Sequence, residues 1–262
     1  MVNKNGRLRI GLALSGGVAR GPVHVGVLSV LEREGIPIDF VAGVSAGALV
    51  GAAYCAGLSI DDLRELSANI GWRQVSRPTW PRYGLVSFAK IEELMENMVG
   101  DLDIRDLAIP YAAVVTDLDR GEQVALREGR LATAVRASCS MPGIVTPVEI
   151  NGRSFCDGGV TDNLPVDVVR QMGADFVIGV DLFMPNFRRR LGPLGAGSAA
   201  LLTLIRQSGG SVKNADCLIM PNISGHSFLN FSRKKSEQYI ALGAAAAQRA
   251  IPQLKTVLNG RS

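Results

Sequence analysis

Short, uninterrupted hydrophobic runs alternate along this chain with segments of helical length and spacing. Runs without polar alternation are typical of strands buried on both faces, and strands separated by helices indicate a parallel sheet. We therefore expect an α/β fold of three layers, in which a mostly parallel central sheet carries helices on both faces. The expected strands are 9–15, 38–44, 110–118 and 175–182, and the expected helices are 22–35, 46–57, 60–70, 164–173 and 241–251.

Two segments depart from this alternation, 71–90 and 183–213, and we predict that both are surface excursions near one end of the sheet. The first contains both tryptophans of the chain. In the second, Phe183 and Phe187 lie beside three arginines at 188–190. A solvated loop is the favoured interpretation of the arginine run. The alternative is peripheral contact with a membrane, because apolar residues next to basic ones suit an anionic interface.

One uncharged stretch, 40–60, is long enough to imitate a membrane span. Gly43, Gly47 and Gly51 repeat within it at the spacing of transmembrane helix pairs. The competing interpretation is a buried strand, a sharp turn and a buried helix, since glycine at this spacing also lets a helix pack close to a sheet. Serines and dense glycines within the stretch favour this second interpretation.

Composition and charge indicate the number of domains, the class of partner and the cellular location, but they do not indicate a reaction. Residues 1–262 show no linker or repeat and are expected to form a single domain. The net charge of +4 is compatible with anionic lipid or with nucleic acid and establishes neither, and nucleic acid is not among the partners that we expect. The four cysteines are widely spaced without a CxxC pair, so no zinc site or disulfide framework is predicted. The first apolar run is too short for a signal peptide, which favours the cytoplasm, with peripheral contact at the inner face of the membrane as a further hypothesis.

The candidate chemistry begins at Ser45, which lies in the pattern Gly-x-Ser-x-Gly between Gly43 and Gly47. An expected strand precedes the serine and an expected helix follows it. This order is typical of a nucleophile elbow, in which a strained turn exposes the serine hydroxyl at the edge of a sheet. The glycines permit the tight backbone that such a turn needs.

A glycine-rich turn also follows the first expected strand, in the segment Gly16-Gly17-Val18-Ala19-Arg20-Gly21. A turn of this kind points backbone N–H groups at an anion. A nucleotide-phosphate loop is one interpretation, but Val18 replaces a glycine of the dinucleotide pattern and the Walker lysine is absent. An oxyanion hole for an ester carbonyl is favoured, because two such turns on adjacent strands face one another at one sheet edge.

The base that would activate Ser45 has three candidates. His24 lies in the expected helix after the glycine turn, where packing against the sheet is its favoured role. His226 lies in a loop-like segment and stays open as a triad member. A carboxylate in direct contact with the serine can also act, and Asp157 stands where a strand-like segment ends in Gly158-Gly159. The competing interpretation of Asp157 is an ordinary Asp-Gly hairpin turn.

The ordered trio GG-x-x-RG, GxSxG and DGG resembles the patatin-like phospholipase family, and the resemblance covers about residues 8–182. It implies a Ser-Asp dyad with Ser45 as nucleophile and Asp157 as general base, acting on acyl esters of lipids without metal or cofactor. It also implies that amides around Gly16, Gly17 and Val18 hold the oxyanion. Arg20 would fix the loop or meet a phosphate head group. The supporting motif residues are Arg20, Gly21, Gly43, Gly47, Gly158 and Gly159.

Two positions depart from the family pattern. Val18 stands where a third glycine is common, and Asp162 stands where asparagine is frequent, which places a second carboxylate near the site or in solvent. The implied function is hydrolysis of phospholipid or lysophospholipid through an acyl-serine. An acyltransferase using the same acyl-serine and a catalytically silent lipid-binding regulator are the alternatives.

Overall fold

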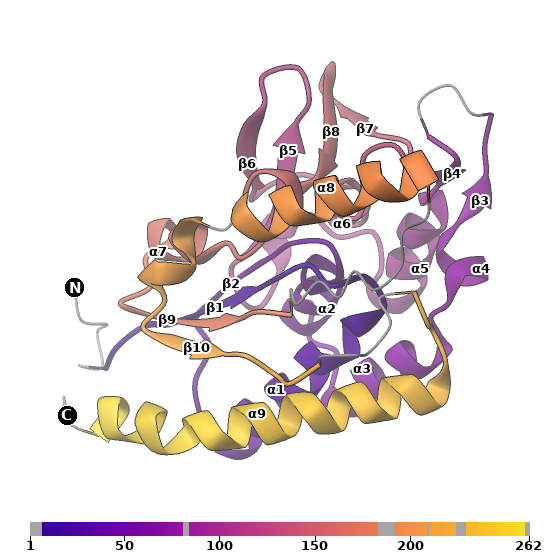
Figure 1. The fold of residues 1–262 in the computed structure, drawn as a ribbon. Coiled ribbons are helices and arrows are strands. Elements are labelled where there is room, and N and C mark those ends of the chain that lie inside the picture. Colours follow the sequence, from indigo (N-terminus) through magenta and orange to yellow (C-terminus); the bar gives the residue numbers. More distant parts are fainter. Residues whose placement is uncertain (1–6, 81–83, 183–191, 209, 224–228, 260–262) are drawn as a thin grey trace.

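The computed structural model describes residues 7–80, 84–182, 192–208, 210–223 and 229–259. An eight-stranded mixed sheet forms its centre, and helices cover both faces (Figure 1). The expected three-layer α/β architecture with a mostly parallel sheet is therefore confirmed. The parallel strands are, in sheet order, β10 (Cys217–Ile219), β9 (Phe176–Val180), β1 (Ile10–Leu14), β2 (Phe40–Gly43) and β5 (Tyr111–Asp117).

The sheet continues beyond β5 in antiparallel pairing. Both β6 and β8 pair with β5, and β7 pairs with β8 to form the far edge. The β7–β8 hairpin turns at Asn151-Gly152, where both residues have positive φ, 52° and 73°. The antiparallel strands are β6 (Glu122–Leu126), β7 (Val148–Ile150) and β8 (Arg153–Asp157).

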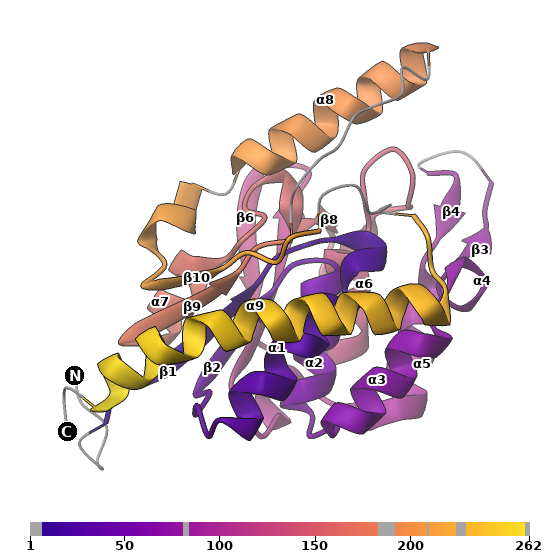
Figure 2. The same ribbon diagram turned by 60° about the horizontal axis from the view of Figure 1, so that its bottom comes forward.

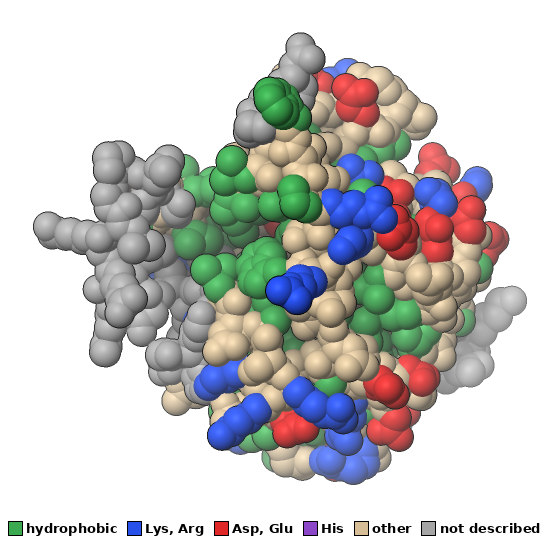
Figure 3. Space-filling model, turned by 90° about the vertical axis from the view of Figure 1, so that its right-hand side faces the viewer, with side chains coloured by type: hydrophobic (Ala, Val, Ile, Leu, Met, Phe, Trp, Pro, Cys, Tyr) green, Lys and Arg blue, Asp and Glu red, His purple; other side chains and the backbone are tan. Residues whose placement is uncertain are grey.

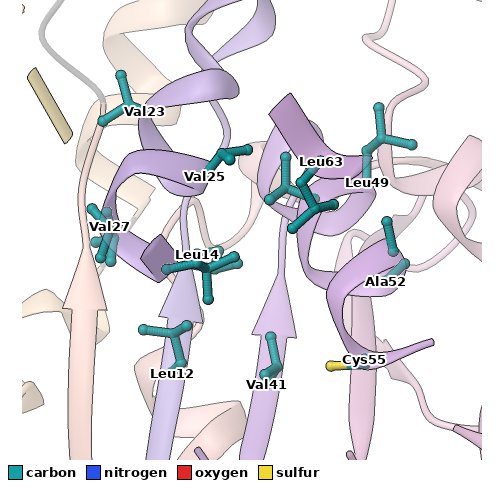
Figure 4. Close-up of a cluster of buried hydrophobic side chains, with 14 of the residues drawn as sticks. Leu12, Leu14, Val23, Val25, Val27, Val41, Leu49, Ala52, Cys55 and Leu63 are labelled. Carbon is teal, nitrogen blue, oxygen red and sulfur yellow. The ribbon is translucent and has the colours of Figure 1, made fainter. Parts of the chain in front are cut away.

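Side chains of the central strands alternate between two hydrophobic clusters. Leu12, Leu14 and Val41 point into the larger cluster, where Figure 4 shows them against the first three long helices, while Ala13 and Ala42 face the smaller one. This period of two is what a strand buried on both faces requires. The helices of the larger cluster are α1 (Pro22–Arg33), α2 (Ala46–Cys55), α3 (Ile60–Asn69), α5 (Ala89–Val99), α6 (Leu131–Ser138) and α9 (Arg233–Asn259).

Helix α7 (Val166–Met172) covers the opposite face of the sheet, which carries small residues there. A Cβ on Gly11 of β1 would lie 2.0 Å from Cγ1 of Val169, so α7 approaches the sheet more closely than a side chain at position 11 would allow. Close approach of this kind leaves no space for water between the layers and buries the apolar face of α7.

The long helix α9 runs across α1 and is held to it through two glycines (Figures 1 and 2). A Cβ on Gly26 of α1 would lie 2.0 Å from the carbonyl oxygen of Ile240, and a Cβ on Gly243 would lie 2.0 Å from that of Val23. The two backbones are therefore in direct contact at this crossing. The C-terminal helix is much longer than the expected 241–251, and Pro252 lies inside it.

The two expected excursions contain regular structure of their own. Segment 71–90 holds the short helix α4 (Trp72–Val75) and the two-stranded hairpin β3 (Arg77–Pro78) and β4 (Val86–Ser87). Segment 183–213 holds α8 (Gly192–Ser208), which projects from the body of the molecule in Figure 2. The phenylalanines and arginines of 183–190, on which the expected membrane contact rested, lie outside the described residues.

The uncharged stretch 40–60 forms a buried strand, a turn and a buried helix, as the favoured interpretation predicted. Across the described ranges, no helix is both long and apolar enough to cross a membrane.

Candidate active site

Ser45 occupies the sharp turn between β2 and α2, with φ 52° and ψ −119°. A positive φ is costly for a residue with a Cβ and persists only where the surroundings enforce it. Gly47 supplies part of that enforcement, because its N–H donates to the carbonyl of Val44 at 2.8 Å. A Cβ on Gly47 would lie 2.4 Å from the carbonyl oxygen of Leu14, so this position requires glycine. The geometry is that of a nucleophile elbow.

Ser138, which the sequence analysis did not identify, accepts a hydrogen bond from the backbone of the nucleophile elbow. The backbone N–H of Ser45 donates to Oγ of Ser138 at 2.9 Å, and that hydroxyl donates to the carbonyl of Val114 at 2.7 Å. Ser138 is fully buried at the C-terminal end of α6. The strained residue is thereby tied to both α6 and β5.

Asp157 ends β8 and is followed by a 3₁₀ turn, η3 (Gly158–Val160). Its Oδ1 accepts a hydrogen bond from the N–H of Gly159 at 2.8 Å. A Cβ on Gly158 would lie 2.3 Å from the carbonyl oxygen of Val114, which explains the glycine at that position. The hairpin interpretation of this Asp-Gly pair is therefore wrong, because the hairpin turns at Asn151-Gly152 instead.

Burial raises the pKa of the Asp157 carboxyl to about 6, against the opposing effects of the Gly159 N–H and the Ser45 hydroxyl. The Ser45 hydroxyl therefore lies close enough to the carboxyl to favour its ionised form. Among the described residues, however, no direct hydrogen bond of ordinary length joins the two side chains.

The glycine turn after β1 faces Ser45 across one edge of the sheet, as adjacent parallel strands require. The sequence predicts that amides around Gly16, Gly17 and Val18 hold the oxyanion. The N–H of Gly16 donates to the carbonyl of Asn163 at 3.4 Å. Within the described part of the chain, the N–H groups of Gly17 and Val18 have no hydrogen-bond partner. Val18 has φ 51°, a backbone conformation that glycine adopts readily and valine rarely does. This explains why glycine is common at this position of the family pattern.

Arg20 is fully buried and holds the glycine turn from inside the protein. Its guanidinium donates to the carbonyl of Leu182 at 3.2 Å. Burial lowers the pKa of Arg20, while the Tyr239 hydroxyl of α9 acts in the opposite direction as charge partner and hydrogen-bond partner. The loop-fixing role matches this environment. The alternative contact with a phosphate head group is wrong for this structure, because the side chain has no access to solvent.

His24 lies beneath the glycine turn and is completely buried. Its Nε2 lies 2.8 Å from the carbonyl oxygen of Ser15, which assigns the ring proton to Nε2. Burial lowers the pKa of the imidazole to about 4. This is the packing role that was favoured for His24. The other candidate, His226, lies outside the described residues.

The residues after the DGG turn also contact the site. Asp162 is buried and accepts a hydrogen bond from Gln123 at 2.9 Å, so this departure from the family pattern does not face solvent. The neighbouring Asn163 was not identified from the sequence. A Cβ on Gly16 would lie 2.8 Å from its Oδ1, and a Cβ on Gly159 would lie 3.1 Å from the same atom. Asn163 therefore packs between the glycine turn and the DGG turn.

A pocket opens beside Ser45 and Asp157, and its wall is almost entirely apolar. An apolar wall of this kind suits a hydrocarbon chain, because burial of each methylene is favourable. Cys139 is buried in its wall, and burial raises the pKa of that thiol. The lining residues with the largest apolar side chains are Leu49, Leu66, Ile70, Trp72, Phe88, Ile91, Met141, Ile144, Leu229 and Phe231.

The helix α8 supports the DGG turn from outside. The Oγ of Ser208 donates to the carbonyl of Gly159 at 2.8 Å, and Ile205 is buried against the same glycine. Because the N–H of Gly159 donates to the Asp157 carboxyl, the C-terminal end of α8 contributes to the placement of that side chain.

Among the described residues, no group of three or more histidine, cysteine or acidic side chains is arranged to hold a metal ion.

Comparison with known proteins identifies the family. The profile of the patatin-like phospholipase family matches residues 12–170, which is more than half of the chain. This chain belongs to that family. The match includes Ser45, Asp157 and the glycine turn, and it ends before α8 and α9.

Similar proteins include an uncharacterised NTE family protein of Mycobacterium bovis, 38% identical over 177 residues. The lysophospholipase NTE1 of Eremothecium gossypii is 35% identical over 179 residues. Each match covers 66% of this chain, but 49% of the first protein and 12% of the second. The chain therefore spans half or less of these relatives.

Among solved structures, VipD from Legionella pneumophila has the same fold, with a TM-score of 0.64 over 100% of this chain and 70% of that one. The two sequences are 14% identical, so the likeness concerns the fold alone.

Proposed function

We propose that this protein is a serine hydrolase that releases fatty acid from phospholipid or lysophospholipid through a Ser45-Asp157 dyad. The observation that carries the proposal is that a strained serine and a buried carboxylate line the same apolar pocket. The pocket accommodates an acyl chain, and the two polar residues at its side would meet the ester. Membership of the patatin-like phospholipase family and similarity to a lysophospholipase support this substrate class.

In the first half-reaction, Asp157 would take the proton of the Ser45 hydroxyl while Oγ attacks the ester carbonyl carbon. The carbonyl oxygen becomes negatively charged. The N–H groups of Gly17 and Val18, which have no partner among the described residues, would bind that oxyanion, aided by the positive end of α2. When the intermediate collapses, the ester C–O bond breaks and the leaving alcohol receives the proton from Asp157. The product is an acyl ester of Ser45.

In the second half-reaction, Asp157 would take a proton from water, and the resulting hydroxide attacks the acyl carbonyl. The same amides bind the second oxyanion. Collapse returns the proton to Ser45 and releases a fatty acid. The raised pKa of Asp157, about 6, suits both halves, because the group is ionised at neutral pH yet basic enough to accept a proton.

The test is fatty-acid release from lysophospholipids, diacyl phospholipids and short-chain aryl esters. Wild type is compared with Ser45→Ala and Asp157→Asn, which we expect to be at least about 10³-fold slower. Ser29→Ala and Asp61→Asn are matched controls, because Ser29 bonds within its own helix and Asp61 is 93% exposed. Labelling by a fluorophosphonate should modify wild type at Ser45 and leave Ser45→Ala unmodified.

Other outcomes would change the function assigned. If labelled acyl chains pass to an added lysophospholipid or glycerol faster than to water, the protein is an acyltransferase that uses the same acyl-serine. If wild type turns over no ester and resists the fluorophosphonate, the hydrolase proposal fails and a lipid-binding regulator becomes the better account. Full activity in Ser45→Ala would also contradict the dyad.

A further inference from the structure

Large apolar side chains are exposed at the pocket and on the neighbouring segment that carries the β3–β4 hairpin, which pairs with the pocket residue Val145. We call Trp72, Trp80, Leu85, Ile144 and Leu229 the mouth surface. Trp80 is 85% exposed, and both Leu85 and Leu229 are 62% exposed. Figure 3 shows apolar side chains gathered on this side of the molecule. Apolar patches of this kind on a folded protein mark sites of contact with a protein or a membrane.

Hydrogen bonds and ring contacts join the chain segments that carry the mouth surface. Leu85 donates through its N–H to the carbonyl of Ile144 at 2.8 Å, and Nε1 of Trp72 donates to the carbonyl of Leu229 at 3.2 Å. Trp72 also packs edge-on against Phe231, with ring centroids 5.2 Å apart. The exposed side chains are thus presented by a connected structure. Trp72, Ile144 and Leu229 also line the pocket, so the mouth surface is continuous with its apolar wall.

Basic side chains, with acidic ones among them, border the apolar side chains on this side of the molecule (Figure 3). Arg73 is exposed and follows Trp72, while Arg233 and Lys234 are exposed at the start of α9, just after Phe231. Within the described ranges neither Arg73 nor Lys234 has an acidic partner, and the pair between Arg233 and Glu237 is long, at 3.7 Å, and exposed. These charges are therefore available to an external anion.

We propose that the mouth surface docks the protein on an anionic phospholipid bilayer. The apolar side chains would enter the boundary between head groups and acyl chains, and the basic residues would meet the head groups. Tryptophan suits that boundary, because its ring is apolar while its N–H can bond to polar groups. The inference rests on the proposed function in one respect: a lipid could pass from the bilayer into the pocket without exposing its acyl chain to water.

The placement of the mouth surface also supports a bilayer over a protein partner. Three of the exposed apolar residues, Trp72, Ile144 and Leu229, also line the pocket, and a lipid surface can supply acyl chains both to the exposed side chains and to the pocket. A protein partner sealed over the same residues would close the pocket to its substrate. A bilayer therefore accounts for the exposed apolar side chains, the basic border and the continuity with the pocket together.

The test measures binding separately from turnover. Ser45→Ala protein is sedimented with vesicles of phosphatidylcholine alone or mixed with phosphatidylglycerol, at low and high salt. We expect binding to the anionic vesicles, weakened by salt. Adding Trp80→Ala and Leu85→Ala should weaken it at least about tenfold, since each change removes a large exposed apolar group. Neither residue lines the pocket, so in the active protein these changes should slow hydrolysis of vesicle lipid but not of a soluble aryl ester.

Leu218→Ala is the matched control, because Leu218 is 38% exposed on β10, at one edge of the sheet. The β3–β4 hairpin pairs with Val145, which precedes β7 at the other edge. Leu218→Ala should leave vesicle binding unchanged. The inference is overturned if anionic vesicles are not bound, or if the double variant binds as well as its parent. It is also overturned if the double variant instead dissociates a dimer in analytical ultracentrifugation. Binding that depends on the mouth surface, without ester turnover by wild type, would uphold the docking surface and reject the hydrolase.

Discussion

The backbone N–H of Ser45 donates a 2.9 Å hydrogen bond to Oγ of Ser138, and this bond joins the strained turn to the end of a helix from another part of the chain. Ser138 passes the constraint on to β5 through its own 2.7 Å bond to the carbonyl of Val114. A buried N–H without a partner is costly, so the elbow conformation and the Ser138 hydroxyl stabilise each other. We infer that Ser138 positions the serine without contacting substrate.

Ser138→Ala should lower kcat for ester hydrolysis and change KM little. The variant leaves the Ser45 N–H unpaired, which costs about 1–3 kcal/mol and loosens the turn that aims the hydroxyl. If that cost falls on the transition state, kcat drops by about 10- to 100-fold. Steady-state kinetics on a soluble aryl ester measure the separation of kcat from KM.

Ser140→Ala provides the comparison, because Ser140 is also buried but its hydroxyl bonds to the carbonyl of Arg136, four residues earlier in the chain. It should retain near-normal kcat. Equal losses of kcat in the two variants, matched by equal losses of thermal stability, would show that Ser138 has only a structural role.

The pH dependence of kcat/KM should report the ionisation of Asp157. Burial raises the pKa of this carboxyl above its usual 3.8 to about 6, and only its ionised form can accept the Ser45 proton. Activity should therefore be constant above about pH 7 and fall about tenfold per pH unit below 6. A pH series with a soluble ester measures the midpoint.

A histidine base would give a similar midpoint, so the variants decide between the two. His226→Ala should keep both the activity and the midpoint of wild type, whereas Asp157→Asn should lose activity at every pH. His24 is a poor candidate for the titration, since its buried imidazole has a pKa of about 4. Loss of the acidic limb in His226→Ala would contradict the dyad.

Asp157→Asn should stabilise the fold at neutral pH while it abolishes activity. The folded-state pKa of about 6 lies above the usual 3.8, so folding disfavours the carboxylate and stability is lost as pH rises through 6. That difference corresponds to at most about 3 kcal/mol at pH 7, and the neutral amide avoids it. We expect a gain of about 1–3 kcal/mol in the free energy of unfolding.

Thermal unfolding at pH 7.5 and at pH 4 tests this. The stabilisation should be clear at pH 7.5 and should nearly disappear at pH 4, where the folded wild type is already protonated at this group. A variant that is less stable than wild type at pH 7.5 would contradict the raised pKa.

Gly47→Ala should destabilise the protein and remove activity. The new Cβ would lie 2.4 Å from the carbonyl oxygen of Leu14, which is backbone and cannot rotate away. Overpacking of this kind costs about 1–3 kcal/mol and would displace the start of α2, where Ser45 is held. Gly197→Ala on α8 is the control. Its Cβ meets no atom within 4 Å, so helix propensity predicts unchanged or increased stability. Circular dichroism melts and ester assays measure both effects.

The central strands could be predicted because each is a continuous apolar run between turn residues, and β1, β2, β5 and β9 all lie inside the expected ranges. The C-terminal helix was predicted too short. Its first turns are rich in charged and polar residues, so the sequence shows no clear apolar face there. The apolar residues of these turns are buried only because α9 packs against α1 and α3. Helix α6 was missed for a similar reason, because a short alanine-rich segment takes its structure from tertiary packing.

Some residues of the candidate site could be identified from the sequence, and others only from the structure. Ser45 and Asp157 stand in local motifs, each a turn with glycines at fixed offsets, so the sequence alone identifies them. Ser138, Asn163 and Tyr239 do not. Each is an ordinary polar residue whose partner lies on another element, such as Tyr239 on α9 beside Arg20 on the glycine turn. Only the folded chain brings these pairs together, and no local pattern marks them.

Gly26 of α1 lies against the backbone at Ile240, and Gly243 of α9 lies against the backbone at Val23. The glycines of α1 and α9 leave no room for a side chain on either helix, and the same crossing carries Tyr239 to Arg20. Substitutions on the two helices must therefore be compensated in pairs. A chimera that joined residues 1–182 to the C-terminal part of another protein should keep a working oxyanion loop only if the incoming helix brings a small residue and a hydroxyl partner at these two places.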